Sequence, residues 1–105
     1  MTSSRIEVFE QMLRGDPENT AVMFGLAKEY EKAGRDEGVV NLLTRYLELA
    51  DDEGNAYGML ASAYRRLGRR DEARRALERG VEVAAAHGHP SMAEDYRMML
   101  ESDED

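Results

Sequence analysis

The sequence has 105 residues and contains no cysteine, no tryptophan and only two prolines. Without cysteine the chain can form no disulfide bond and offers no thiolate to a metal, a composition compatible with a reducing cytoplasm. No apolar run approaches the roughly 20 residues that span a bilayer. Residues 1–14 alternate polar and apolar side chains instead of forming the apolar block of a signal peptide. These absences predict a cytoplasmic protein.

Positive charge is also scarce, because 14 basic residues face 22 acidic ones and the formal net charge is −8. Such a balance opposes unspecific binding to nucleic acid. Seven arginines nevertheless fall within residues 65–79. Asp71, Glu72 and Glu78 lie among them at spacings that pair charges along one helix, and no aromatic residues are interleaved. We therefore expect this stretch to be ion-paired and do not expect nucleic-acid binding.

No stretch alternates apolar and polar residues as a β-strand does, so the sequence predicts an all-α fold. Apolar residues recur instead at spacings of three and four, which is typical of amphipathic helices. Pro90 suits the first turn of the last helix. Short connections between consecutive helices indicate antiparallel hairpins. The six expected helices cover residues 4–17, 20–33, 36–50, 55–67, 71–86 and 91–101.

The ends of these helices have recognisable signals. Ser3 or Ser4 can cap the first helix and Asp36 the third. Gly34 and Gly68 supply the left-handed residue that ends the second and fourth. The side chains expected on the buried sides are Ile6, Phe9, Leu13, Met23, Leu26, Ala27, Tyr30, Val39, Leu43, Tyr46, Leu47, Tyr57, Leu60, Ala61, Tyr64, Ala73, Leu77, Val81, Met92, Tyr96, Met99 and Leu100.

One stretch of the chain occurs twice. LAKEYEKAGR at residues 26–35 returns as LASAYRRLGR at residues 60–69, an offset of 34 residues. A fixed offset of this size indicates a repeat architecture, in which each unit buries its apolar face only by stacking on a neighbour. The matching positions are Leu26 and Leu60, Ala27 and Ala61, Tyr30 and Tyr64, Gly34 and Gly68, and Arg35 and Arg69.

This pattern resembles the tetratricopeptide repeat family. Two stretches, residues 20–53 and 54–87, each look like a full repeat. Tyr46 departs from the small residue that the family has at its position, so we expect altered helix packing there. Asp51 and Ala85 stand where the family has a closing proline. The residues that carry the resemblance are Met23, Leu26, Ala27, Tyr30, Gly34, Val39 and Leu43, and then Tyr57, Leu60, Ala61, Tyr64, Gly68, Ala73, Leu77 and Gly80.

The same frame extends to both sides of the full repeats. Residues 4–17 resemble the second helix of an earlier repeat, with Phe9 at the aromatic position and Pro17 at the closing position. Residues 91–101 resemble a capping helix. The resemblance implies a single domain over residues 1–101, wound as a right-handed α-α superhelix, followed by an acidic tail at residues 102–105. The chain can also be one piece of a larger array.

The resemblance further implies that the first helix of each repeat lines a concave groove that holds a segment of another protein. These side chains are apolar at one end and basic at the other, which favours an acidic or C-terminal peptide. The Lys, Asn and Arg clamp of chaperone-binding members is largely absent. The groove candidates are Ala21, Phe24, Gly25, Lys28 and Lys32 in one repeat, and Asn55, Gly58, Met59, Ser62, Arg65 and Arg66 in the next.

Other interpretations remain open. The basic candidates can be ordinary solvated charges, some paired with Glu29 or Glu31. The chain can also self-associate through the exposed face of its N-terminal half-repeat. His87 and His89 are explained by their position at a helix end and make a weak metal site. No phosphate loop, nucleophile elbow or zinc signature is present, so we expect neither an enzyme nor a bound cofactor or metal.

Overall fold

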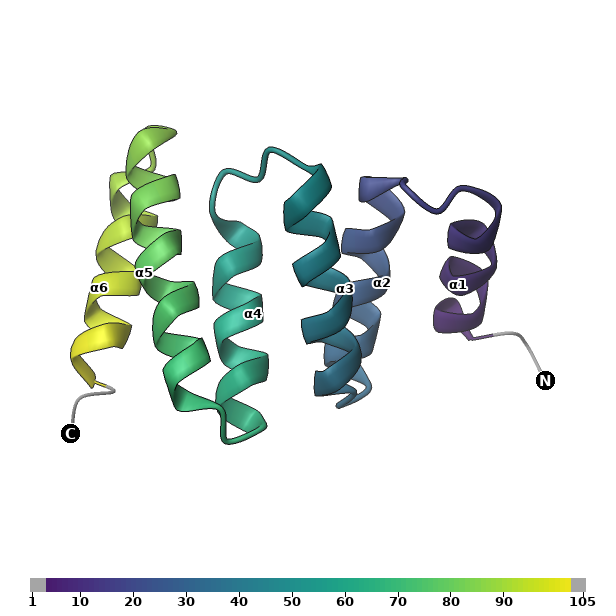
Figure 1. Cartoon of the computed structure of the whole chain (residues 1–105), viewed down its shortest axis with the longest axis horizontal. Coiled ribbons are helices and arrows are strands. Elements are labelled where there is room, and N and C mark those ends of the chain that lie inside the picture. Colours follow the sequence, from purple (N-terminus) through teal and green to yellow (C-terminus); the bar gives the residue numbers. More distant parts are fainter. Residues whose placement is uncertain (1–3, 103–105) are drawn as a thin grey trace. The chain divides into compact units, whose positions relative to one another are not determined.

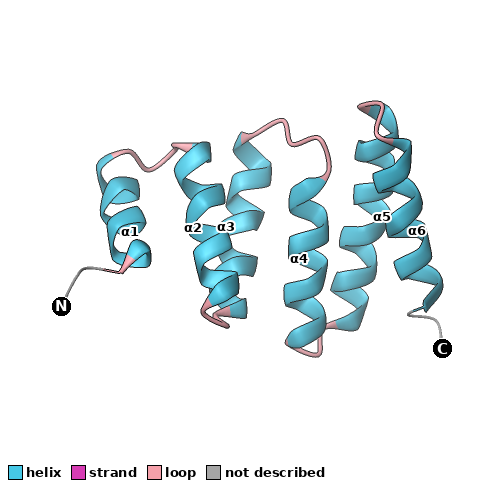
Figure 2. Cartoon of the chain, turned by 180° about the vertical axis from the view of Figure 1, so that it is seen from behind, coloured by secondary structure: helices cyan, strands magenta, loops and turns pink. Residues whose placement is uncertain are grey.

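The computed structural model describes residues 4–102, and within them all regular secondary structure is helical (Figures 1 and 2). The expected all-α fold with six helices is confirmed. No helix in this range is both long enough and apolar enough to cross a membrane. The chain divides into two compact units, unit 1 up to Ala50 and unit 2 from Asp51. The helices are α1 (Arg5–Gly15), α2 (Thr20–Lys32), α3 (Asp36–Leu49), α4 (Asn55–Arg66), α5 (Arg70–Ala86) and α6 (Pro90–Ser102).

Helix α1 begins with a complete capping box. The Ser4 hydroxyl accepts a hydrogen bond from the Glu7 amide at 3.1 Å, and the Glu7 carboxylate accepts one from the Ser4 amide at 3.2 Å. Two amides that the first turn leaves without helical partners are thereby satisfied. The alternative cap Ser3 lies outside the described residues, as do residues 103–105 of the predicted tail.

The prediction that Asp36 caps α3 is wrong by one position. Asp36 is the first helical residue, and the cap is Arg35, which makes no side-chain capping bond. The carboxylate therefore acts through its charge near the positive end of the helix. The same shift occurs at α5, which begins at Arg70 instead of the expected Asp71. Helix α6 likewise begins one residue before the expected start at residue 91, and Pro90 is its first residue and so lies in the first turn, as predicted.

Glycines end the first helix of each hairpin, as the sequence predicted. Gly34 and Gly68 have φ values of 74° and 78°. The next amide then reaches back to a tyrosine carbonyl, from Arg35 to Tyr30 at 2.9 Å and from Arg69 to Tyr64 at 2.8 Å. This is the hydrogen bond of a left-handed helix end. The repeat of 34 residues in the sequence is thus also a repeat of backbone geometry.

In unit 1, α2 and α3 form an antiparallel hairpin, and α1 packs on α2 (Figure 1). Met23, Leu43 and Val39 are completely buried between the hairpin helices. Helix α1 contains no fully buried residue. Its Phe9 ring lies on Gly25 of α2, where an added Cβ would come within 3.0 Å of the ring. Unit 1 therefore has its core in the α2–α3 hairpin, with α1 as a partly covered flank.

In unit 2, α5 packs against both α4 and α6 (Figure 2). Its core consists mostly of alanine, with Leu60 and Leu77 as the large aliphatic side chains. Tyr96 of α6 is buried, as predicted. The tyrosines of the first helices and of α3 were also expected to be buried, but they are only half-buried: Tyr30, Tyr46, Tyr57 and Tyr64.

Candidate functional site

In unit 1, the candidates on α2 form one stripe along the helix. Ala21, Phe24, Lys28 and Lys32 follow one another at spacings of three and four, so they share a face. Phe24 is half-buried, and the other three side chains are exposed. We call these four residues the α2 stripe. It is apolar near the start of α2 and basic towards its end, the polarity expected from the sequence.

Two aromatic rings hold the middle of the α2 stripe in place. The Phe24 ring lies 5.4 Å from the Tyr46 ring of α3, measured between centroids, with a tilt of 39°. The Lys28 ammonium lies 5.2 Å from the centre of the Phe24 ring. Such a cation is attracted to the ring face and still presents its N–H donors to solvent. Tyr46, which departs from the family pattern, thus supports the stripe from behind, a role that its spacing did not reveal.

The two lysines of the stripe have different electrostatic surroundings. Lys32 donates to the Glu29 carboxylate at 3.3 Å, the pairing foreseen in the sequence. Glu29 is largely covered, with 13% of its side chain exposed, and also pairs with Arg5 at 3.4 Å. Within residues 4–102, no carboxylate pairs with Lys28. Lys28 is therefore the cation of the α2 stripe that is most available to a ligand.

In unit 2, the candidates on α4 also share one face. Asn55, Gly58, Ser62, Arg65 and Arg66 form what we call the α4 stripe. Asn55 and the two arginines are exposed, whereas Gly58 and Ser62 are half-buried. Both arginines already take part in interactions with the chain, so a ligand there has to share or replace them.

A tyrosine from α6 covers the middle of the α4 stripe. The Tyr96 hydroxyl donates to the Gly54 carbonyl at 2.7 Å and accepts from the Gly58 amide at 3.2 Å. A Cβ at position 58 would lie 2.7 Å from that hydroxyl oxygen. Burial raises the pKa of Tyr96, so the phenol stays protonated and can donate. Gly58 consequently serves the packing of α6 on α4, a contact that the helical spacing of Tyr96 did not foretell.

The remaining candidates, Gly25 and Met59, are both half-buried. Gly25 lies under the Phe9 ring of α1, so its open backbone serves the contact between α1 and α2. By helical spacing Gly25 lies between Ala21 and Lys28 on the face of the α2 stripe, and Met59 lies between Asn55 and Ser62 on the face of the α4 stripe. The structure therefore brings the stripe candidates together within each helix, and it assigns the glycines among the candidates to helix packing.

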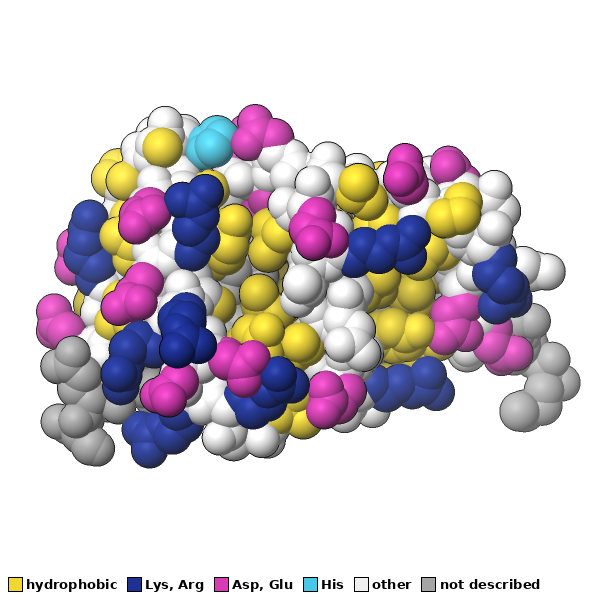
Figure 3. All heavy atoms as spheres, in the orientation of Figure 1, with side chains coloured by type: hydrophobic (Ala, Val, Ile, Leu, Met, Phe, Trp, Pro, Cys, Tyr) yellow, Lys and Arg dark blue, Asp and Glu magenta, His cyan; other side chains and the backbone are white. Residues whose placement is uncertain are grey.

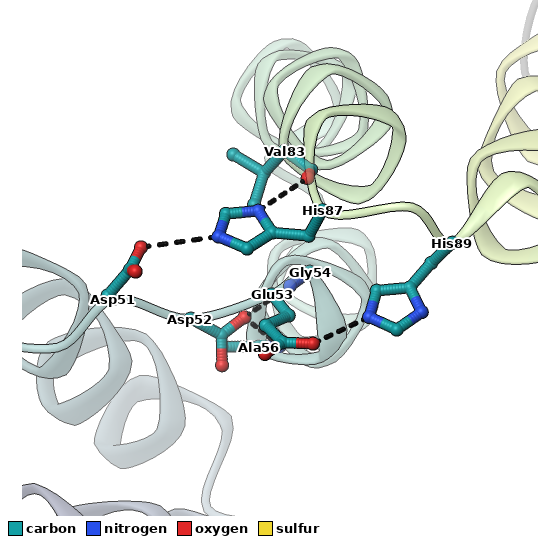
Figure 4. Close-up of polar contacts among 8 residues, drawn as sticks. All are labelled: Asp51, Asp52, Glu53, Gly54, Ala56, Val83, His87 and His89. Atoms are coloured by element: carbon teal, nitrogen blue, oxygen red, sulfur yellow. Dashed lines mark hydrogen bonds and ion pairs between the residues drawn. The ribbon is translucent and has the colours of Figure 1, made fainter.

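Histidines near the end of α5 contact the corner before α4 (Figure 4). The His87 Nδ1 lies 2.9 Å from the Val83 carbonyl, and its Nε2 lies 3.5 Å from the Asp51 carboxylate. Because both neighbours are acceptors, the ring satisfies both when it is protonated. The hydrogen bond to Val83, aided by the charge of Asp51, accordingly raises the pKa of His87.

A second histidine makes a parallel contact. The His89 Nε2 lies 2.6 Å from the Glu53 carboxylate, and this hydrogen bond lowers the pKa of Glu53. Between the two histidine contacts, the Asp52 carboxylate accepts from the amides of Gly54 at 2.8 Å and Ala56 at 3.1 Å, which caps the start of α4. Within residues 4–102, no three His, Asp or Glu side chains meet in a way that could hold a metal ion. The cluster is a polar clasp between two corners of unit 2.

Two arginines of the arginine-rich stretch pair with acidic residues three positions later, although these are not the pairs that the spacing of Asp71, Glu72 and Glu78 predicted. Arg69 donates twice to the Glu72 carboxylate, at 2.7 and 2.9 Å, and Arg79 donates to Glu82 at 3.0 Å. The contact with Arg69 lowers the pKa of Glu72. Figure 3 shows basic and acidic side chains interspersed over this part of the surface. The arginines therefore do not form an uninterrupted basic patch on this face.

Comparison with known proteins identifies the family. The tetratricopeptide repeat profile matches residues 54–87, which contain α4 and α5. The chain is also similar to the TPR repeat-containing protein PA0015 of Pseudomonas aeruginosa, with 32% identity over 95 residues that cover 90% of each chain. Together with the matching helix ends at Gly34 and Gly68, this similarity shows that the chain belongs to the tetratricopeptide repeat family.

Proposed function

We propose that this protein binds a peptide segment of a partner protein on the first helices of its repeats, and that it does so as a scaffold without catalysing a reaction. Repeats of this family generally mediate interactions between proteins. The observation that carries the proposal is the Lys28 ammonium, which is held over Phe24 and has no carboxylate partner within residues 4–102. The similarity to a bacterial protein supports action in a bacterium, and the cytoplasm is the compartment we propose.

The chemistry of the two stripes suits an acidic or C-terminal peptide. A carboxylate bound by Lys28 would form a charge-assisted hydrogen bond, and an apolar neighbour in the peptide would lie on the exposed part of Phe24. On the α4 stripe, Arg65 and Arg66 offer guanidinium donors, and Asn55 and Ser62 offer neutral ones. Each stripe thus combines a cation, which attracts an acidic peptide, with weaker polar or apolar contacts, which orient the peptide along the helix.

The proposal is tested by capture from a bacterial lysate followed by titration of the captured protein. The bait is the full chain, compared with a variant carrying Lys28→Glu, Arg65→Glu and Arg66→Glu. The control carries the same change of charge at exposed positions away from both stripes, with Arg74, Arg75 and Arg97 changed to Glu. We expect the stripe variant to lose at least about tenfold in affinity and the control to bind as the wild type. Equal loss in both variants would show that net charge, and not the stripes, governs binding.

A second candidate function is self-association through α1. Its Val8 and Met12 side chains are 46% and 49% exposed and lie one helical turn apart. An isologous contact would cover them. Sedimentation from micromolar to millimolar concentration tests this candidate, with Val8→Glu and Met12→Glu as the disrupting variant. A monomer mass at every concentration would exclude it.

A further inference from the structure

Unit 1 contains a groove that none of the α2 stripe residues lines. It has a volume of about 710 Å³ and lies between α1 and α3. Leu26 and Tyr30 of α2 form its floor, and Leu13 and Leu42 form the apolar part of its walls. In Figure 3 apolar surface is visible between the positions of α3 and α1, with basic side chains at its edge. We call this feature the α1/α3 groove.

A glycine keeps the groove open. Gly38 stands where the next repeat, 34 residues later, has Glu72. A Cβ at position 38 would come within 2.9 Å of the Tyr30 ring, so the absence of a side chain lets that ring lie against α3 as part of the floor. The Tyr30 hydroxyl is fixed by a 2.6 Å hydrogen bond to the Glu10 carboxylate. Burial and this bond raise the pKa of Tyr30 to about 12, so the floor stays uncharged.

Two arginines line one end of the groove. Arg14 lies in the last turn of α1, and Arg45 on α3 donates to the Pro17 carbonyl at 2.6 Å, which orients its guanidinium. Arg14 forms no hydrogen bond or ion pair with another residue of the range 4–102. The acidic member of the lining, Glu10, lies one helical turn before Arg14, and its carboxylate is already bound by Tyr30. The groove therefore has a cationic end and an apolar middle.

We infer that the α1/α3 groove is a second binding site, for a protein segment that has a large apolar side chain followed by carboxylates. The apolar side chain lies on Leu26 and the Tyr30 ring, and the carboxylates reach Arg14 and Arg45. Guanidinium groups bind carboxylates through paired donors, and Arg45 has donors left after its bond to Pro17. The exposed Asn41 amide, one turn before Arg45, can bond the backbone of the segment.

The occupant is a segment of another protein because the groove is an open channel walled by two helices. Such grooves accept a peptide along their length, with side chains as anchors. The arginines specify the acidic character of that peptide by charge complementarity. This site differs from the two stripes in its residues, so one chain of this family can hold two different segments.

A phage-displayed library of random 12-residue peptides, selected on the full chain, tests the inference. We expect a class of peptides with an apolar residue followed by Asp or Glu. A synthesised member of this class should bind Arg14→Glu at least about tenfold more weakly than the wild type, and Arg74→Glu equally well. Asn41→Trp fills the groove without changing charge and should weaken binding as much. Circular dichroism establishes that each variant is folded.

The controls separate this site from the others. Peptides of this class should bind Lys28→Glu as they bind the wild type, whether or not the α2 stripe has a function. The inference is overturned if no acidic class is enriched, or if Arg14→Glu and Asn41→Trp bind the peptide normally. It is also overturned if sedimentation shows a wild-type dimer that Arg14→Glu dissociates, because the occupant is then a second copy.

Discussion

The two units share a repeat but build their cores from different side chains. The buried apolar residues of unit 1 are Val22, Met23, Leu26, Ala27, Val39, Val40, Leu42 and Leu43. Those of unit 2 are Ala56, Leu60, Ala61, Ala63, Ala73, Ala76, Leu77, Ala84, Ala93 and Tyr96. The first set contains one alanine, and the second contains seven. Unit 1 is therefore filled by large aliphatic side chains, and unit 2 by small ones.

Small side chains let helices approach closely, and in unit 2 the space that remains is filled by tyrosine. Gly80 of α5 lies between the Tyr57 and Tyr96 side chains, where an added Cβ would come within 2.8 Å of the Tyr96 ring. At Gly38 in unit 1, an added Cβ would meet the Tyr30 ring, which lies beside the open α1/α3 groove. The comparison teaches that unit 2 has little room for change, whereas unit 1 has room that a ligand can use.

The largest effect is expected from truncating the central leucine of each unit. Leu43 and Leu77 occupy the same repeat position and are both completely buried. Leu43→Ala and Leu77→Ala should each lower the free energy of unfolding by about 2–5 kcal/mol. Leu77→Ala should cost more, because unit 2 has few large side chains that can shift into the cavity. Urea unfolding measures both values, and a larger loss for Leu43→Ala would contradict the comparison.

The next effect concerns the two glycines that face tyrosine rings. Gly80→Ala should destabilise the protein by about 1–3 kcal/mol, because the methyl group has no space between Tyr57 and Tyr96. Gly38→Ala should be near neutral, since Tyr30 can move towards the groove and alanine favours a helix by about 0.5–1 kcal/mol. Urea unfolding of Gly80→Ala and Gly38→Ala, each compared with the wild type, measures the two effects. Equal destabilisation would show that the groove offers Tyr30 no freedom.

A smaller effect is expected from removing the tyrosine hydroxyls. Tyr96→Phe removes the hydroxyl that donates to the Gly54 carbonyl and accepts from the Gly58 amide, and leaves that carbonyl only the 3.2 Å bond from the Tyr57 amide. The loss of two partly buried hydrogen bonds should cost about 1–3 kcal/mol. Tyr30→Phe releases Glu10, which can turn to water, and should cost about 0.5–1 kcal/mol. Urea unfolding of Tyr96→Phe and Tyr30→Phe compares the free energy that each hydroxyl contributes to its unit. The account fails here if the unit 1 variant is the less stable one.

The smallest effect is the pH dependence of the clasp in unit 2. The pKa of His87 is raised above its ordinary 6.5, so its contribution is present below that pH and is lost as pH rises through the raised value. The pKa of Glu53 is lowered from 4.5, so its contribution is present above that pH and is lost as pH falls through the lowered value. Both contacts therefore stabilise unit 2 most between pH 4.5 and 6.5.

Melting temperatures of the wild type and His87→Gln, compared from pH 5.5 to pH 8.5, test this dependence. The two proteins should differ most at the acidic end of this range, because the charged ring is then paired with Asp51. Their difference should shrink as the pH rises. A constant difference over the whole range would mean that the ring acts through packing alone.

Much of the fold could be predicted from the sequence because the signals were local. Apolar spacing specified six helices, and the glycines at 34 and 68 ended two of them in the predicted conformation. The start of α3 was misplaced by one residue, since an aspartate acts equally well as a cap or within the first turn. Helix propensity and capping are properties of neighbouring residues, and a single sequence contains them in full.

The candidate site was less predictable because it depends on contacts between distant residues. The stripes followed from helical spacing, but the cover of Tyr96 on Gly58 joins residues 38 positions apart. The contact between Phe24 and Tyr46, and the contact of Gly38 with the Tyr30 ring at the groove, also join different helices. The sequence showed that Tyr46 departs from the family pattern. It also showed that position 38 holds Gly where the next repeat has Glu. Neither of these two departures revealed which side chain would pack against residue 46 or residue 38.

The measurement that most directly tests the proposed function is a map of amide chemical-shift changes in the full chain when the captured partner's peptide is added. We expect the changes to centre on the exposed stripe residues, with Lys28 on α2 and Arg65 on α4 among the largest, and to vanish in the Lys28→Glu, Arg65→Glu, Arg66→Glu variant. Changes confined to other helices, and retained in that variant, would contradict binding on the first helices of the repeats.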